Sequence, residues 1–281
     1  MRRAAKTAII SGVNRGAGNA SSAARPAVYR GFPGQTDPEA SDRAQTILSI
    51  LRGRKAIRFL DIGCGDGQLT ARVREVVNAR EVHGVDVDPE AIRRAREKGI
   101  RTVQVDLDRE PLPYPSNFFD LVLASEVIEH IYDPGGLLAE THRVLTPGGE
   151  FIVTTPNLAS WYNRLALLLG FQPWLTSASL HNPGAGKLNL GRFLTKVGTI
   201  GGDHLRVVTL KALRDIALAH GFTPVKFHVV SPIHLFDARA QAALRIPLWL
   251  AQNTVGRFPA LSSTLVAQLV ATKETGARGD D

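Results

Sequence analysis

Two separate segments of the chain carry side chains that can bind a metal ion or move a proton. Glu126, Glu129 and His130 lie in the run SEVIEH, and His204 lies in GGDHLRVVT. In a helix the first three would stand at positions i, i+3 and i+4, on one face. Two carboxylates and an imidazole on one face can hold a hard divalent cation such as Mg²⁺, with His204 as a further ligand. Such a cation lowers the pKa of a hydroxyl and so makes it a better nucleophile.

Two other interpretations of these residues need no metal. Histidine titrates near neutral pH, so His130 can act as a general base with Glu129 and His204 beside it. In the remaining interpretation the polar groups are structural and only satisfy one another. The residue types and their spacing leave all three open.

A glycine-rich turn is the second feature with chemical meaning. The run FLDIGCGDGQL, residues 59–69, passes from an apolar strand end through Gly63, Gly65 and Gly67 into the first turn of a helix. Glycine permits backbone conformations that side chains forbid, so a ligand can lie against bare peptide. Open α/β sheets bind nucleotides at this place, the carboxyl end of the first strand. A nucleoside-containing ligand is therefore expected.

The residues around the turn favour one nucleoside ligand over two others. Gln68 occupies the position where a dinucleotide fingerprint needs its last glycine, and the Gly-Lys-Ser/Thr run of a phosphate-binding loop is absent from the sequence. Asp61 and Asp66 would repel a pyrophosphate but attract the sulfonium and ammonium of S-adenosylmethionine. About twenty residues on, a second strand ends in Asp86, where a ribose-binding carboxylate belongs. Asp88 is the alternative ribose ligand, but with Pro89 behind it this residue suits a helix N-cap.

Several motifs in order resemble the class I S-adenosylmethionine-dependent methyltransferases. They are the glycine turn, GVDVDPEAI (84–92), VDLDREPLPYPSNFFDLVLASEVIEHI (105–131) and RVLTPGGEFIVTTPN (143–157). The resemblance covers residues 58–157 closely and extends more loosely to residue 273. It implies S-adenosyl-L-methionine as cofactor, with the glycine turn facing the methionine part and an acid after the third strand near the adenine. The cofactor contacts expected from the residues and the resemblance together are Asp61, Gly63, Cys64, Gly65, Gly67, Asp86, Val87, Asp106, Leu107, Ser125 and Glu126.

The resemblance also bears on the metal question. The element E-x-x-E-H at Glu126 to His130 is similar to that of the quinone-pathway O-methyltransferases, and to that of RNA 3′-end 2′-O-methyltransferases, which also use a later histidine. Many methyltransferases without a metal carry a similar run, so the resemblance implies a divalent cation only as one alternative. The metal ligands would be Glu126, Glu129, His130 and His204. Thr209, after His204, is expected to be an N-cap.

Composition limits the broad class of the protein. The chain has 281 residues, a formal net charge of +8 and a single cysteine, so an intramolecular disulfide is excluded and a cytoplasmic location is expected. Residues 1–36 contain basic residues but no acid, which predicts a disordered basic leader, with an organelle-targeting leader as the alternative. Residues 37–273 are expected to form the methyltransferase domain and residues 274–281 a flexible tail. No apolar run reaches the length of a membrane span.

Alternating strand and helix patterns predict a doubly wound, Rossmann-like α/β fold. The resemblance implies a mostly parallel sheet of seven strands with an antiparallel last strand. Two segments exceed ordinary connections, at about 158–203 and 236–258, and are rich in aromatic and aliphatic residues. Both are expected to be lid insertions over an apolar or lipid-linked acceptor, with a satellite core or a dimer contact as the equal alternative. Peripheral contact with a membrane surface is a third reading.

The expected helices are 40–51, 68–78, 89–98, 134–145 and 209–220, and the expected strands are 57–62, 81–87, 101–105, 119–124, 150–155, 225–230 and 263–272.

Three functions are compatible with these features. The first is methyl transfer to a small hydroxylated acceptor, such as a saccharide, a lipid-linked sugar or a phenolic ring. The second is RNA 3′-end 2′-O-methylation, although the basic residues gather in the leader and no aromatic–basic stacking surface is evident, which argues against a nucleic-acid partner. The third is a cofactor-binding protein without transfer activity. The acceptor and the oligomeric state are left open.

Overall fold

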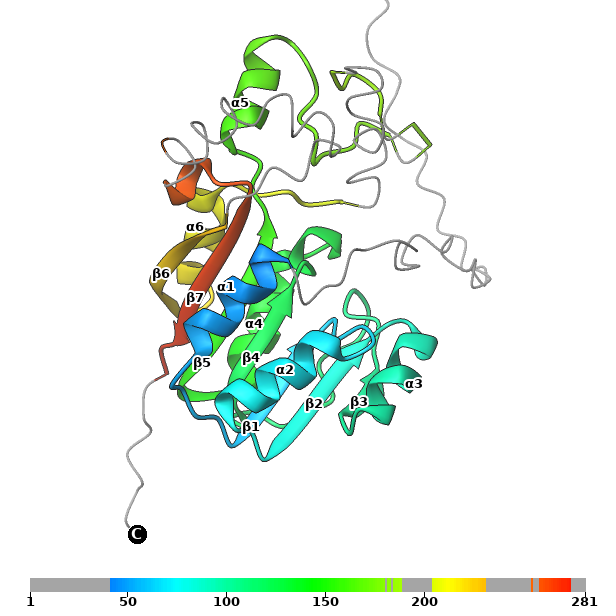
Figure 1. Ribbon diagram of the computed structural model, residues 1–281, viewed down its shortest axis with the longest axis vertical. Coiled ribbons are helices and arrows are strands. Elements are labelled where there is room, and N and C mark those ends of the chain that lie inside the picture. Colours follow the sequence, from blue (N-terminus) through cyan, green and yellow to red (C-terminus); the bar gives the residue numbers. More distant parts are fainter. Residues whose placement is uncertain are drawn as a thin grey trace, which may run out of the picture.

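The computed structural model describes residues 41–179, 181–182, 184–188, 204–230, 254 and 258–273. Within this part of the chain the strands form one seven-stranded sheet in the order β3-β2-β1-β4-β5-β7-β6 (Figure 1). Neighbours from β3 to β5 are parallel, whereas β7 is antiparallel to both β5 and β6. The predicted Rossmann-like, mostly parallel sheet is confirmed. The strands are β1 (Arg58–Ile62), β2 (Glu81–Asp86), β3 (Arg101–Gln104), β4 (Phe119–Ser125), β5 (Leu145–Pro156), β6 (Phe222–Val230) and β7 (Thr264–Ala271).

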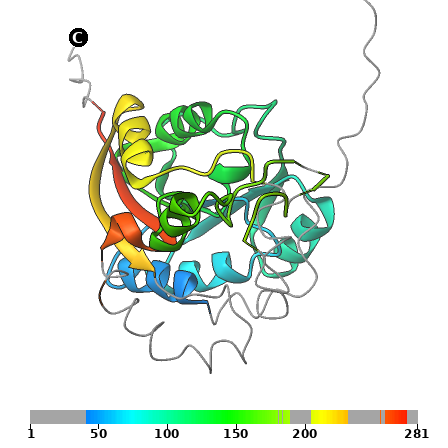
Figure 2. The same ribbon diagram turned by 90° about the horizontal axis from the view of Figure 1, so that it is seen from above.

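Helices cover both faces of the sheet. The view from above separates the blue and cyan helices α1 and α2 from the green and yellow helices α4 and α6 across the sheet (Figure 2). One buried cluster joins side chains of α1, α2 and α3 to one face of the strands, and another joins those of α4 and α6 to the opposite face. This is the layering of a doubly wound fold. The helices are α1 (Asp42–Leu51), α2 (Gln68–Val77), α3 (Pro89–Glu97), α4 (Pro134–Val144), α5 (Trp161–Leu168) and α6 (Leu210–Ala219).

Alternation along the central strands divides the core between the two faces. On β1, Leu60 and Ile62 pack toward α4 and α6, whereas Phe59 packs toward α1 and α2. All three side chains are fully buried, as expected for a parallel strand that is covered on both faces. The side chain of Asp61 follows Phe59 by two positions and therefore lies on the α2 side of the sheet.

Local capping residues fix where the helices begin. The Asp88 side chain accepts a hydrogen bond from the Glu90 amide and Pro89 occupies the first turn of α3, as the sequence predicts. Thr209 likewise caps α6 by accepting from the Ala212 amide. The N-cap role of both residues is confirmed.

One predicted boundary is wrong. The run Pro147-Gly148-Gly149 was expected to separate a helix ending at Leu145 from a strand beginning at Glu150. The structure ends α4 at Val144 and begins β5 at Leu145, so that the Pro-Gly-Gly run lies inside the strand. Gly148 has a positive φ of 74°, and the register with β4 shifts between Phe119 and Leu121. The two glycines therefore form a bulge within β5 and do not end the strand.

The first insertion forms a small hydrophobic cluster of its own between residues 161 and 188. Tyr162, Ala166 and Trp174 are its buried members, and they are separate from the two clusters of the sheet. Two buried asparagines attach this cluster to the sheet, because the Asn163 Nδ2 group donates to the Asn157 carbonyl and Asn163 Oδ1 accepts from the Trp174 amide. A satellite core is thus present in the described half of the insertion, and a lid role stays a prediction.

The expected leader 1–36, the tail 274–281, residues 189–203 and most of the second insertion lie outside the described residues. Within the part of the chain that the structure covers, no helix is both long and apolar enough to cross a membrane.

Candidate active site

The glycine turn adopts a conformation that only glycine tolerates well. Gly63, Gly65 and Gly67 all have positive φ, at 70°, 52° and 79°. A Cβ on Gly63 would come within 2.5 Å of Val127 Cγ2, and one on Gly67 within 2.5 Å of Ile100 Cδ1. A Cβ on Gly65 would meet nothing within 4 Å. The outer two glycines therefore permit close packing of the loop, while the middle one leaves open space against bare backbone.

Asp86 holds this turn from the end of β2. Its Oδ2 atom accepts a hydrogen bond of 2.8 Å from the Gly65 amide, and its Oδ1 atom accepts one of 2.9 Å from the Asp88 amide. Asp88 itself is occupied as the N-cap of α3. The carboxylate at the turn is thus Asp86, and its contact with a ribose stays a prediction. The partly exposed Val87 follows it and offers an apolar surface at the same edge.

Asp106, the acid that follows β3, lies at the same edge of the sheet as Asp86. Asp86 is paired with Gln104 across the parallel strands, which places Asp106 two residues beyond the end of β3 on the same side. Its Oδ1 atom accepts from the Asp108 amide, and its Oδ2 atom forms an ion pair of 3.4 Å with Arg109. The half-buried Leu107 packs against the core beside it. The contact of Asp106 and Leu107 with an adenine stays a prediction.

Asp61 is buried beneath the glycine turn. Its Oδ2 atom accepts a hydrogen bond of 2.6 Å from the Thr70 hydroxyl, while its Oδ1 atom has no partner among the described residues. Burial raises the pKa of Asp61 to about 7. The neighbouring Cys64 is also buried, and burial raises the pKa of its thiol, so a thiolate is disfavoured there. Cys64 is thus a small residue packed in the turn and not a nucleophile, and its contact with the cofactor stays a prediction.

The substitution Asp61→Asn is expected to stabilise the free protein at pH 8 by up to about 4 kcal/mol and to have little effect at pH 4. The folded pKa of about 7 lies above the unfolded value, so the folded state binds the proton more tightly. Stability from this group is therefore lost as pH rises toward 7, and the neutral amide removes that loss. Urea midpoints of both proteins across this pH range measure the effect. A gain that is equal at pH 4 and pH 8 would contradict the assignment.

Ser125 and Glu126 end β4 beside the glycine turn. The Ser125 hydroxyl lies 3.3 Å from that of Thr154 on β5. Glu126 has a positive φ of 58°, its amide donates to the Thr154 carbonyl, and its Oε1 atom accepts from the Thr154 hydroxyl. Its Oε2 atom lies 3.3 Å from Arg43 Nη1 on α1. The expectation that Glu126 shares a helix face with Glu129 and His130 is therefore wrong, because a left-handed residue cannot continue a right-handed helix.

Arg43 is a residue that the sequence did not single out. Its Nε atom is buried and has no hydrogen-bond partner in the described part of the chain, while Nη1 pairs with Glu126. A buried guanidinium donor without an acceptor costs free energy, and an anionic group beside Arg43 would offset that cost. Arg43 lies on the first helix, far in sequence from the motifs, so the sequence gave no indication that it belongs to the site.

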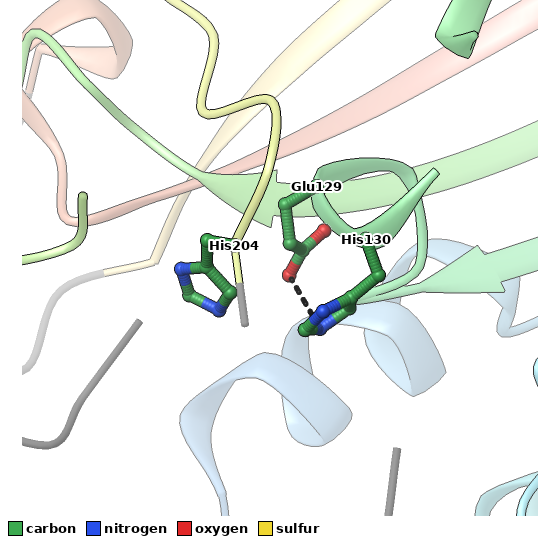
Figure 3. A group of neighbouring side chains, drawn as sticks. All are labelled: Glu129, His130 and His204. Atoms are coloured by element: carbon green, nitrogen blue, oxygen red, sulfur yellow. Dashed lines mark ion pairs between the residues drawn. The ribbon is translucent and has the colours of Figure 1, made fainter. Parts of the chain in front are cut away.

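Glu129, His130 and His204 come together at the end of β4, with ligand atoms within 4.8 Å of one another (Figure 3). The short 3-10 helix Ile128–His130 carries the first two. The Glu129 carbonyl accepts hydrogen bonds from the amides of Leu205 (2.7 Å) and Arg206 (3.0 Å), which holds the His204 segment against it. Of the four predicted metal ligands, three are thus neighbours, whereas Glu126 is engaged by Arg43 and Thr154.

The Glu129 carboxyl group is fully buried between the two histidine rings (Figure 3). Oε2 accepts from the Thr155 hydroxyl at 3.1 Å, and Oε1 lies 4.0 Å from His130 Nε2. Burial, and then the nearby charge of Glu126, raise the pKa of Glu129 well above its usual range. The site therefore favours uptake of a proton or a cation next to this carboxyl group.

Hydrogen bonding fixes the protonation of His204. Its Nδ1 atom lies 2.9 Å from the Leu175 carbonyl oxygen, which can only accept, so Nδ1 carries the hydrogen. In the neutral ring Nε2 then keeps a lone pair, which can serve as a base or as a metal ligand. The rings of His130 and His204 meet edge to face at 5.0 Å.

Comparison with known proteins identifies the family of the domain. Residues 60–153, which span the glycine turn through β5, match the methyltransferase domain family. This part of the chain is a class I S-adenosylmethionine-dependent methyltransferase domain. S-adenosylmethionine is the cofactor of this family.

Two relatives and one solved structure illustrate the similarity. The chain is 35% identical over 132 residues to a ubiquinone biosynthesis O-methyltransferase of Bradyrhizobium, covering 46% of this chain and 50% of the relative. It is 32% identical over 240 residues to a 37.1 kDa protein of a Streptomyces fradiae transposon, and the match covers 81% of this chain and 61% of the relative. The chain thus spans about half of the length of these relatives. The structure of an S-adenosylmethionine-dependent methyltransferase from Mesorhizobium loti matches with a TM-score of 0.55 at 19% identity. The match covers 83% of this chain and 99% of that protein, and it supports the fold.

Proposed function

We propose that this methyltransferase transfers a methyl group from S-adenosylmethionine to a hydroxyl group of a small acceptor. The observation that carries the proposal is the contact between two features. Val127, which packs against Gly63 of the cofactor turn, lies in the same short segment as Glu129 and His130. The glycine turn and a group of proton-accepting side chains thus share one edge of the sheet, where α/β folds bind their ligands.

The residues around the glycine turn fit this cofactor in charge. When bound, S-adenosylmethionine supplies a methyl group already activated by a cationic sulfonium. Asp86 can accept hydrogen bonds from the ribose hydroxyls, and the unpartnered Oδ1 atom of Asp61 offers an acceptor beneath the turn. The partly exposed Arg43 guanidinium can pair with the methionine carboxylate, leaving Glu126 to face the ammonium group. Asp106 with Leu107 and Val87 would lie around the adenine.

The acid–base part of the proposal rests on His204 and its neighbours. The Leu175 carbonyl keeps the hydrogen on Nδ1, so Nε2 can remove the proton of the acceptor hydroxyl. The buried Glu129 carboxyl group lies beside this ring, and its ionised form would stabilise the imidazolium. His130 lies against both and can share the proton. The rest of the rate would come from holding the acceptor in line and excluding water.

A panel of acceptors tests this function most broadly. Full-length protein is incubated with methyl-labelled S-adenosylmethionine and with sugars, phenols and short RNAs. The proposal predicts label on a hydroxylated small molecule. Label on the 3′-terminal ribose of RNA would support the 2′-O-methylation alternative instead. Saturable cofactor binding without label on any acceptor would support a binding protein without transfer activity. A cytoplasmic location is part of the same prediction and needs separate localisation.

A divalent cation on Glu129, His130 and His204 is the second candidate for the chemistry of this cluster. Three ligand atoms within 4.8 Å favour it, and Nδ1 of His204 donates to a carbonyl as metal-binding histidines do. A cation bound there would lower the pKa of the acceptor hydroxyl.

In the base mechanism, His204 removes the proton of the acceptor hydroxyl without help from a metal. This mechanism predicts that dialysis against EDTA changes the turnover rate by no more than about twofold. The measurement compares initial rates with EDTA, with added Mg²⁺ and with added Mn²⁺. Loss of most turnover in EDTA, with recovery on addition of one cation, would replace the base mechanism by the metal-assisted one.

A further inference from the structure

An exposed arginine–tyrosine pair borders the histidine cluster. The guanidinium carbon of Arg206 lies 5.1 Å from the ring centroid of Tyr132, in a cation–π arrangement. Tyr132 is 66% exposed, although it is a large aromatic residue beside a buried site. Each member stands two residues after a histidine of the cluster, since Tyr132 follows His130 and Arg206 follows His204. The pair therefore lies next to the proposed reaction site.

Backbone hydrogen bonds hold both residues in place. The Arg206 amide donates to the Glu129 carbonyl at 3.0 Å, and the Tyr132 amide donates to Asp108 Oδ1 at 2.7 Å. The two chain segments are more than seventy residues apart in sequence, yet both are tied to the same end of the sheet. The cation–π pair is thus supported by backbone hydrogen bonds on both sides.

The arginine has no carboxylate partner in the described part of the chain. Its side-chain contacts there are the Tyr132 ring and a long hydrogen bond of 3.4 Å from Nη1 to the Leu205 carbonyl. A cation–π contact does not use up the five N–H donors of a guanidinium, which stay available to a further partner. These donors match the two oxygens of a carboxylate or phosphate group.

We propose that Arg206, held over the Tyr132 ring, binds an anionic group of the methyl acceptor, either a carboxylate or a phosphate. This inference deepens the proposed function, on which its link to the acceptor rests. The acceptor class would then be a hydroxylated acid or a hydroxylated phosphate ester, with the charge at the outer end and the reacting hydroxyl at His204. Neutral sugars and simple phenols would lack the contact.

The anion contact is measured without the cofactor, so that it does not depend on transfer activity. The Nε–Hε signals of full-length ¹⁵N-labelled protein are followed by NMR while benzoate, phenyl phosphate or neutral benzyl alcohol is added. The Arg206 signal, assigned by its loss in Arg206→Gln, is expected to shift saturably with one or both anions and not with the alcohol. Benzoate and phenyl phosphate distinguish the two kinds of anion. Arg214→Gln, the same charge change on the exposed side of α6, is the matched control.

Two variants separate positioning from charge. Tyr132→Ala removes the ring that orients the guanidinium and is expected to weaken anion binding about tenfold, whereas Tyr132→Phe keeps it. Absence of any Arg206 shift with both anions, or an equal shift with benzyl alcohol, would overturn the proposal. If the anions bind but the protein does not bind S-adenosylmethionine, the proposed function fails while the anion site stands.

Transfer rates complete the test. Catechol is compared with 3,4-dihydroxybenzoate, and glucose with glucose 6-phosphate. Arg206→Gln should lower kcat/KM for the charged member of the productive pair about tenfold and leave the neutral member unchanged. Equal loss for both members would contradict a role in recognising charge.

Discussion

Asp86→Ala is expected to lower the affinity for S-adenosylmethionine about 100-fold or more. The substitution removes the acceptor proposed for the ribose hydroxyls and also the acceptor of the Gly65 amide, so the glycine turn loses its support. A hydrogen bond to a charged group contributes roughly 1.5–3 kcal/mol, and about 1.4 kcal/mol corresponds to tenfold in affinity. Isothermal titration calorimetry of the full chain measures the change directly.

Asp88→Ala is the matched control for this experiment. The residue lies two positions further along and caps α3, so its loss should cost about 1 kcal/mol of stability while cofactor affinity stays close to that of the wild type. NAD should not bind to any of the proteins. Unchanged affinity of Asp86→Ala, or an equal loss in Asp88→Ala, would show that the carboxylate does not bind the ribose.

His204→Ala is expected to lower kcat by a factor of about 10² to 10⁴ with little change in cofactor affinity. The imidazole is the proposed base, and its Nδ1–H is already committed to the Leu175 carbonyl, so no other nitrogen of that ring can replace Nε2. Single-turnover rates with the acceptor found in the panel, together with cofactor titration, separate the two effects.

Chemical rescue distinguishes the base from a structural histidine. Imidazole added to His204→Ala should restore part of the rate if the lost group moved a proton, and should do nothing if it only held Leu175. His220→Ala, at the end of α6 and outside the cluster, should retain full activity. A rate for His204→Ala within twofold of the wild type would remove His204 from the mechanism and direct attention to His130.

The sequence predicted well those features that local chemistry determines. Three glycines at alternate positions leave few alternatives to a turn with positive φ, and the structure places Gly63, Gly65 and Gly67 in that conformation. Asp88 before a proline was recognisable as an N-cap for the same reason, since capping depends on neighbours in the chain. The fold class followed from alternating apolar strands and helices.

Features that depend on distant contacts were missed or mispredicted. Helical spacing suggested that Glu126 belongs with Glu129 and His130, but its contacts with Thr154 and Arg43 accompany a left-handed backbone at this position. Arg43 and Arg206 gain their significance from partners that lie more than seventy residues away, Glu126 and Tyr132. Periodicity within a short window carries no signal for such pairs.

The most direct test of the cofactor site is a crystal structure of the full chain with S-adenosylhomocysteine. The proposal predicts the ligand against the backbone of Gly65, with its ribose hydroxyls on Asp86 and its carboxylate on Arg43. No ligand at the glycine turn at saturating concentration, or a ligand bound elsewhere, would contradict it.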